Sequence, residues 1–180
     1  MESITKEQLI ALLNEDIALE YSAAIQYIQH YAVMSGAEFD AVRAHLLQHS
    51  EEEIGHAVLL SDRVNYMGGV PSAEVAPIKG SSDPLGMLQI NAESEKNAVA
   101  RYKERIAQAQ ALGEFGLVQL LQGILMDEEE HENDILTSLG AHAKTEEVVL
   151  PVEEEPSRFS QVVLSRFASL REERSKRSAV

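Results

Sequence analysis

The sequence contains no cysteine, which excludes thiolate metal sites, iron–sulfur clusters and disulfide bonds. Aromatic residues make up only 5 % of the chain, whereas Ala, Leu, Ile and Glu are abundant, and this composition favours helices over sheets. Prolines are few, and none occurs before Pro71. No apolar run approaches the ~20 residues that a membrane-spanning helix requires. We therefore expect an all-α protein that has no membrane partner.

An excess of acidic residues gives the chain a formal net charge of −15 at pH 7. Such a surface repels phosphates and attracts cations, so we expect no nucleic-acid partner. The N-terminus lacks the charged and then apolar pattern of a secretion signal, and we expect a cytoplasmic protein.

Apolar residues recur at three- or four-residue spacing in four long stretches, as they do along one face of a helix. The predicted helices cover Thr5–Ser35, about Glu38–Met67, about Pro84–Leu112 and about Glu114–Ser138. In the second helix the pattern assigns the apolar positions to Leu46, Leu47, Ile54, Val58, Leu59 and Val64. Thr5 with Gln8, and Asp83 with Pro84, are typical of helix starts.

Residues 68–84 are rich in glycine and proline, which makes a helix improbable there. A connection of this length can run along a bundle and start the third helix at the end where the second began. The sequence therefore predicts a four-helix bundle over residues 1–140, with a long crossover between helices two and three.

Four residue types recur after 75 positions: Glu20, Tyr27, Glu53 and His56 correspond to Glu95, Tyr102, Glu128 and His131. In each half, a lone Glu precedes a Glu-x-x-His unit by 33 residues. Positions i and i+3 share a helix face, so each unit directs a carboxylate and an imidazole the same way. Four carboxylates and two imidazoles can converge only inside a bundle, where they suit a pair of iron ions. Without metal, the four carboxylates would repel one another and take up protons.

These motifs resemble the ferritin-like di-iron carboxylate proteins, most closely the bacterioferritins. The resemblance covers about residues 5–140, and its matching pieces are Leu13–Glu15, Ala23–Tyr27, Glu53-x-x-His56 and Asp127–His131. It implies a ferritin-like fold with two iron ions per chain, held by Glu20, Glu53, His56, Glu95, Glu128 and His131. By the resemblance, Glu53 and Glu128 bridge the ions, each His binds one, and Glu20 and Glu95 cap the ends. Manganese or mixed metals use the same ligands.

Residues beside the ligands also receive expected roles. Asp127 and Glu52 each precede a ligand Glu, and we expect each to orient the His of the opposing helix. Tyr27 matches a tyrosine that in bacterioferritins lies beside the di-iron centre and donates an electron. The alternative is that Tyr27 and Tyr102 are core residues whose hydroxyls reach the wet edge of the core.

The remaining histidines are expected at the surface. His45 and His49 lie two turns and one turn before Glu53, and we expect both to be solvated, with an access site for cations as the alternative. His30 and His142 are also expected at the surface.

Two positions depart from related families. Bacterioferritins bind haem through a Met directly after the ligand Glu of helix two, and this chain has Ile54 there, so we expect no haem. Rubrerythrins carry an additional Glu three residues after the helix-three ligand, and this chain has Ala98 there. That difference, with the lack of a cysteine-rich module, disfavours peroxidase chemistry of the rubrerythrin type.

Residues 141–180 differ in character from the rest. An acidic, proline-bounded linker covers 146–156, and an amphipathic short fifth helix is predicted after Ser157, with Phe159, Val163 and Phe167 on one face. This tail is expected to dock on a neighbouring subunit or a partner protein.

The resulting hypothesis is a ferroxidase that oxidises Fe(II) with O2 or H2O2 and stores iron in a hollow homo-oligomer of 12 or 24 chains. The first alternative is a di-iron peroxide reductase that acts as a dimer. The second is a metal-free interaction protein whose tail binds a partner.

Overall fold

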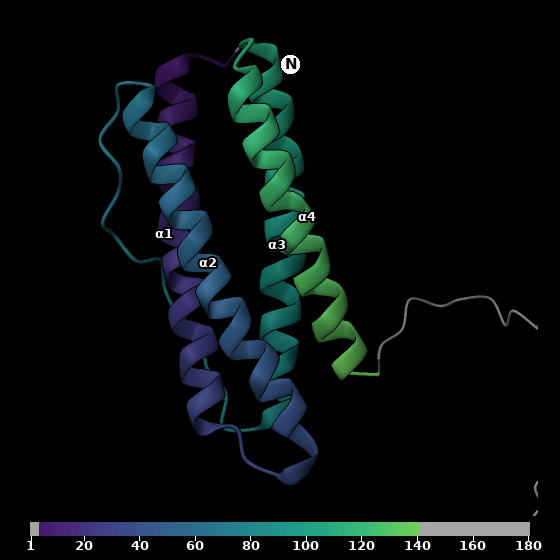
Figure 1. Ribbon diagram of the computed structural model, residues 1–180. Helices are drawn as coiled ribbons and strands as arrows, with labels where there is room; N and C mark the ends of the chain where they lie inside the picture. Colours follow the sequence, from purple (N-terminus) through teal and green to yellow (C-terminus); the bar gives the residue numbers. More distant parts are fainter. Residues whose placement is uncertain (1–3, 141–180) are drawn as a thin grey trace, which may run out of the picture. The chain divides into compact units, whose positions relative to one another are not determined.

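The computed structural model describes residues 4–140, which form an all-α four-helix bundle (Figure 1). The helices are α1 (Lys6–Val33), α2 (Asp40–Tyr66), α3 (Pro84–Ala111) and α4 (Phe115–Ser138), with a short 3₁₀ helix η1 (Ala37–Phe39) before α2. Each α-helix begins and ends within two residues of the predicted bounds, and the fold class is confirmed. The predicted linker and fifth helix lie outside the described residues.

The helix starts follow from local side chains. The Thr5 hydroxyl accepts a hydrogen bond from the Gln8 amide, and the Gln8 side chain accepts one from the Thr5 amide, as the predicted capping box requires. At α3, the Asp83 carboxylate accepts a hydrogen bond from the Gly86 amide, and Pro84 occupies the first helical position. Gly113 has a φ of 74° where the chain reverses between α3 and α4.

The crossover between α2 and α3 runs along the bundle, so that α2 and α3 point the same way, as predicted (Figure 1). α1 packs mainly against α2, and α3 packs mainly against α4. The crossover is attached to α1 by hydrogen bonds at four-residue spacing from Asn14, Ala18, Ser22 and Gln26. One side of α1 therefore carries the connection, and this leaves the opposite side free to face the bundle interior.

The bundle interior contains two apolar clusters. One cluster includes Leu13, Ile17, Leu60 and Leu121, and the other includes Met34, Leu46, Leu88 and Ile135. On α2 and α4 the buried polar residues lie between these clusters, and on α1 and α3 most of them do. The interior is therefore apolar at both ends and polar at mid-height, where the candidate site lies.

The predicted apolar face of α2 is only partly correct. Leu46 and Val64 are fully buried, whereas four of the predicted apolar residues are 39–54 % exposed in the single chain: Leu47, Ile54, Val58 and Leu59. The inward positions between Leu46 and Val64 are taken largely by polar side chains such as His49, Glu53 and His56. Apolar residues next to them in the sequence consequently face outward, because successive residues on a helix are about 100° apart. Among the described helices, none has the length and apolar character needed to span a bilayer.

Candidate metal centre

The six candidate ligands predicted from the sequence meet at the centre of the bundle. Each is at most 3 % exposed: Glu20 from α1, Glu53 and His56 from α2, Glu95 from α3, and Glu128 and His131 from α4. Their ligand atoms form two groups, and within each group all lie within 4.8 Å of one another. One group contains Glu20 and His56, and the other contains Glu95 and His131. Glu53 and Glu128 belong to both groups, so the two sets of donors share two carboxylates.

Each imidazole turns its Nδ1 atom toward the carboxylates. His56 Nδ1 lies 3.2 Å from Glu53 Oε2, 3.2 Å from Glu128 Oε1 and 3.5 Å from Glu20 Oε2. His131 Nδ1 lies 3.3 Å from Glu53 Oε1 and 3.9 Å from Glu95 Oε2. The two halves of the repeat therefore meet around one centre with equivalent donor atoms.

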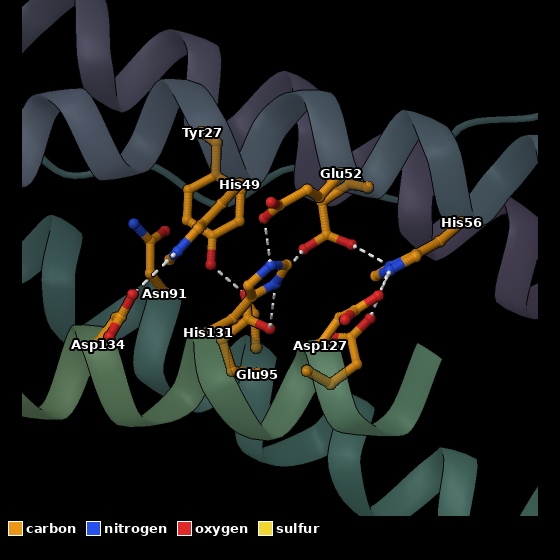
Figure 2. Close-up of polar contacts among 12 residues, drawn as sticks. Tyr27, His49, Glu52, His56, Asn91, Glu95, Asp127, His131 and Asp134 are labelled. Atoms are coloured by element: carbon orange, nitrogen blue, oxygen red, sulfur yellow. Dashed lines mark hydrogen bonds and ion pairs between the residues drawn. The ribbon is translucent and has the colours of Figure 1, made fainter. Parts of the chain in front are cut away.

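The outer nitrogen of each imidazole contacts a carboxylate from the opposing helix, as predicted. His56 Nε2 lies 3.1 Å from Asp127 Oδ2, and His131 Nε2 lies 2.8 Å from Glu52 Oε2. Figure 2 shows Glu52 reaching from α2 to His131 on α4, and Asp127 reaching from α4 to His56 on α2. When Nε2–H donates to these carboxylates, the neutral imidazole directs its Nδ1 lone pair inward, and this is the tautomer that a metal ligand needs.

Three buried ligand atoms at the centre make no hydrogen bond of acceptable geometry in the described structure, although oppositely charged groups lie within 3.3 Å of them. They are Glu53 Oε1, Glu128 Oε1 and His131 Nδ1. Buried polar atoms are normally satisfied, so such a set requires an explanation. Four carboxylates and two imidazoles around one point are suitable donors for divalent iron or manganese. The residues present therefore fit a pair of metal ions.

Protonation compensates part of the central charge. Burial and the Glu20 carboxylate raise the pKa of Glu53 to about 8, and burial and the Glu53 carboxylate raise that of Glu128 to about 7. Burial and the charge of Glu128 also raise the pKa of Glu95 well above its ordinary value. These three residues behave as the sequence predicts.

Glu20 does not follow this prediction. Burial alone would raise its pKa, but hydrogen bonds with His56 and Glu53 and the charge of Arg101 lower the pKa of Glu20 to about 2. Arg101 Nη2 lies 3.1 Å from Glu20 Oε1. The sequence pattern did not indicate this partner, because Arg101 lies outside the repeated set of Glu, Tyr and His.

The two repeated tyrosines lie next to the lone Glu of the other half. Tyr27 and Tyr102 are core residues, as the alternative expected, but both are at most 1 % exposed, so the expected position of their hydroxyls at a wet edge is wrong. The Tyr27 hydroxyl donates a hydrogen bond to Glu95, and the Tyr102 hydroxyl donates one to Glu20. Burial raises the pKa of both phenols well above the ordinary value, so both remain protonated donors. Each hydroxyl thus orients the carboxylate of one lone Glu.

A cavity of about 140 Å³ reaches the centre from the side of α1, α3 and the crossover. The four central Glu side chains line it, together with residues that include Lys79, Ala98 and Arg101. The four carboxylates are therefore reached by a cavity of a few water molecules' size from this side of the bundle.

Two histidines that were expected at the surface are buried. His49 is 2 % exposed; its ring stacks on His131 with centroids 4.1 Å apart and meets the Tyr27 ring edge-on at 5.5 Å (Figure 2). Its four-residue spacing from Glu53 was the available signal, because residues i and i+4 share a helix face. His30 is fully buried, and its Nδ1 lies 2.9 Å from Asn91 Oδ1. His45 is exposed, as predicted, and His142 lies outside the described residues.

Comparison with known proteins assigns the chain to a family. The family model of the ferritin-like domain matches residues 10–166. A bacterioferritin of Brucella melitensis is 30 % identical over 138 residues, covering 76 % of this chain and 86 % of the relative. A solved structure from Bacillus anthracis, described as ferritin-like and diiron-carboxylate, has a TM-score of 0.72 and 32 % identity over 74 % of this chain and 96 % of its own.

A second solved structure has a comparable fold. It is a dodecameric thioferritin, described as a bacterioferritin-related protein of Bacteroides fragilis, with a TM-score of 0.71 and 28 % identity. The match covers 77 % of this chain and 88 % of the solved one. The sequence match, the bundle and the central donor set agree, and the chain belongs to the ferritin-like family.

Proposed function

We propose that this protein binds two iron ions per chain and oxidises Fe(II) at the centre of the bundle, with O2 or H2O2 as the oxidant. One observation carries the proposal: two groups of four ligand residues share Glu53 and Glu128 at a buried point. In this assignment Glu20 and His56 complete one metal position, and Glu95 and His131 complete the other. Paired Fe(II) ions supply one electron each when they are oxidised.

Neighbouring residues orient the side chains that would bind the metal ions. Asp127 and Glu52 hold the imidazoles with Nδ1 inward, and Tyr27 and Tyr102 hold the terminal carboxylates. The apolar clusters on either side of the site close the two ends of the bundle to water, which leaves the lateral cavity as the opening to the centre. The resemblance to bacterioferritins assigns an electron-donor role to Tyr27, and its contact with Glu95 is compatible with that role.

We further propose that the ferric product is stored in a hollow homo-oligomer. Support comes from the relative described as a dodecamer and from an exposed apolar face on α1 and α2. Ile25 and Ile28 on α1, and Leu47, Ile54 and Val58 on α2, are 39–54 % exposed. On each helix these positions recur at intervals that bring them to one side, as in an interface with a second copy.

The experiment uses stopped-flow absorbance after Fe(II) is mixed with metal-free protein in aerated buffer. Glu53→Ala and Glu128→Ala should each abolish the rapid oxidation while the helical circular dichroism signal is retained. Glu51→Ala and Glu130→Ala are matched controls, because these exposed residues belong to the same acidic runs and should leave the rate unchanged. Rapid oxidation retained in both ligand variants would remove the proposal.

The alternative peroxide reductase is tested on the same preparation. A reductase of the rubrerythrin type would carry a further carboxylate at the position of Ala98, which is 6 % exposed in this chain. A native mass measurement with metal analysis separates the two functions, because storage needs a shell of 12 or 24 chains and the reductase a dimer. Protein that retains no metal after loading would favour the interaction-protein hypothesis.

A further inference from the structure

The 75-residue repeat extends beyond the ligands to the polar residues around them. Adding 75 to Asp16, Gln26 and His30 gives Asn91, Arg101 and Arg105. All six are buried or mostly buried, and in both halves they contact the corresponding partners. In each half, three of these six residues form a polar layer next to the lone Glu: Asp16, Arg101 and Arg105 beside Glu20, and Gln26, His30 and Asn91 beside Glu95. The contacts within the layer are the same in both halves, whereas its charge differs.

The layer beside Glu20 is charged. Arg105 donates hydrogen bonds to the fully buried Asp16 through Nε at 2.7 Å and Nη2 at 3.0 Å. Arg101 lies between two acids, with Nε 3.0 Å from Asp16 Oδ1 and Nη2 3.1 Å from Glu20 Oε1. Two guanidinium groups face one Asp, so this layer presents a surplus positive charge to Glu20. A guanidinium does not lose its proton in proteins, and this charge is permanent.

The layer beside Glu95 is neutral. Gln26 Nε2 donates to Asn91 Oδ1 at 3.0 Å, in the place of the Arg101–Asp16 pair. His30 Nδ1 contacts the same Asn91 oxygen, in the place of Arg105. Within the described residues, the ion pairs of Glu95 involve only His131.

We propose that the two metal positions differ in their affinity for a divalent cation and that Arg101 causes this difference. Arg101 opposes a divalent cation beside Glu20 by its charge and by its contact with Glu20 Oε1, whereas among residues 4–140 no arginine forms an ion pair with Glu95. The position with Glu95 and His131 then fills first, and the position with Glu20 and His56 fills second. The inference rests on the proposed pair of metal positions and assigns to Arg101 a positioning and selectivity role. We expect the two dissociation constants to differ by ~10-fold or more, because a unit charge a few ångströms away is worth at least the 1.4 kcal/mol that a tenfold change represents.

The test is an anaerobic titration of the metal-free protein with Co(II), followed by visible absorbance and calorimetry. Wild-type protein should show two separate binding phases. Arg101→Gln reproduces the residue type of the other half and should tighten the weaker site, so that the two constants converge. Lys103→Gln is the matched control: it removes a positive charge from the same helix at a side chain that is 57 % exposed, and should leave the ratio unchanged.

The outcomes separate this inference from the proposed function. Absence of Co(II) binding would overturn both. Two equal sites in the wild type, an unchanged ratio in Arg101→Gln, or an equal effect of Lys103→Gln would overturn the inference alone. If Arg101→Gln fails to fold, wild-type crystals soaked with one equivalent of Mn(II) show which of the two metal positions fills first. Anomalous density beside Glu95 supports the inference, and density first beside Glu20 refutes it.

Discussion

Replacement of Asp16 by Asn should destabilise the metal-free protein strongly. The Asp16 carboxylate is fully buried and has three guanidinium nitrogens within 3.0 Å, two from Arg105 and one from Arg101. The substitution leaves the Arg105 side chain, which is only 6 % exposed, with neutral partners such as Gln108. Removal of one member of a buried ion pair costs ~3–5 kcal/mol. Arg101 keeps its ion pair with Glu20 in the variant, so we expect the free energy of unfolding to fall by an amount at the lower end of this range, ~3 kcal/mol.

The measurement is urea unfolding by circular dichroism at 222 nm, with chelator present and at fixed protein concentration, because metal or subunit binding would add stability. Glu15→Gln is the control, since it removes the exposed neighbouring acid and should change the free energy of unfolding by less than ~0.5 kcal/mol. Adding Arg105→Met to Asp16→Asn removes the unpaired charge and should recover at least ~1 kcal/mol. A loss below ~1 kcal/mol in the single variant, or a further loss in the double variant, would refute the reasoning.

Two further predictions concern other parts of the chain. Burial lowers the pKa of His30 below its ordinary value of 6.5. As the pH falls below 6.5, His30 takes up a proton in the unfolded chain but stays neutral in the folded chain. The free energy of unfolding therefore decreases between pH 6.5 and the lower pKa of the folded state. Denaturation of wild type and His30→Gln from pH 7.5 to 5 should show a shallower pH dependence in the variant, and parallel curves would contradict the burial argument. Deletion of residues 157–180 should change oligomer size or partner binding, because burial of Phe159, Val163 and Phe167 is worth ~1.5–3 kcal/mol each; native mass and pull-down results identical to the full chain would instead indicate that the tail does not dock.

The periodicity of the sequence was sufficient to predict the helices and to identify the candidate ligands. Helix bounds depend on local signals, such as the Thr5 capping box and the Asp83–Pro84 start, and these are readable in a few residues. The six candidate ligands were predictable because two Glu-x-x-His units and two lone Glu residues repeat at one interval, and i, i+3 spacing directs each unit to one face. The contacts of Asp127 and Glu52 with the imidazoles followed from the same register.

Tertiary structure alone decided which helix side faces inward and which distant residues meet. Polar ligands occupy the inner positions of α2, so Leu47 and Ile54 face outward although their spacing fits an apolar stripe. Arg101 meets Glu20 across 81 positions, and Arg105 meets Asp16 across 89, because α1 lies beside α3. An arginine or a histidine on a helix is most often solvated, so its burial depends on a neighbour that local sequence does not specify. The charge difference between the two otherwise equivalent halves becomes visible only when these pairs are in place.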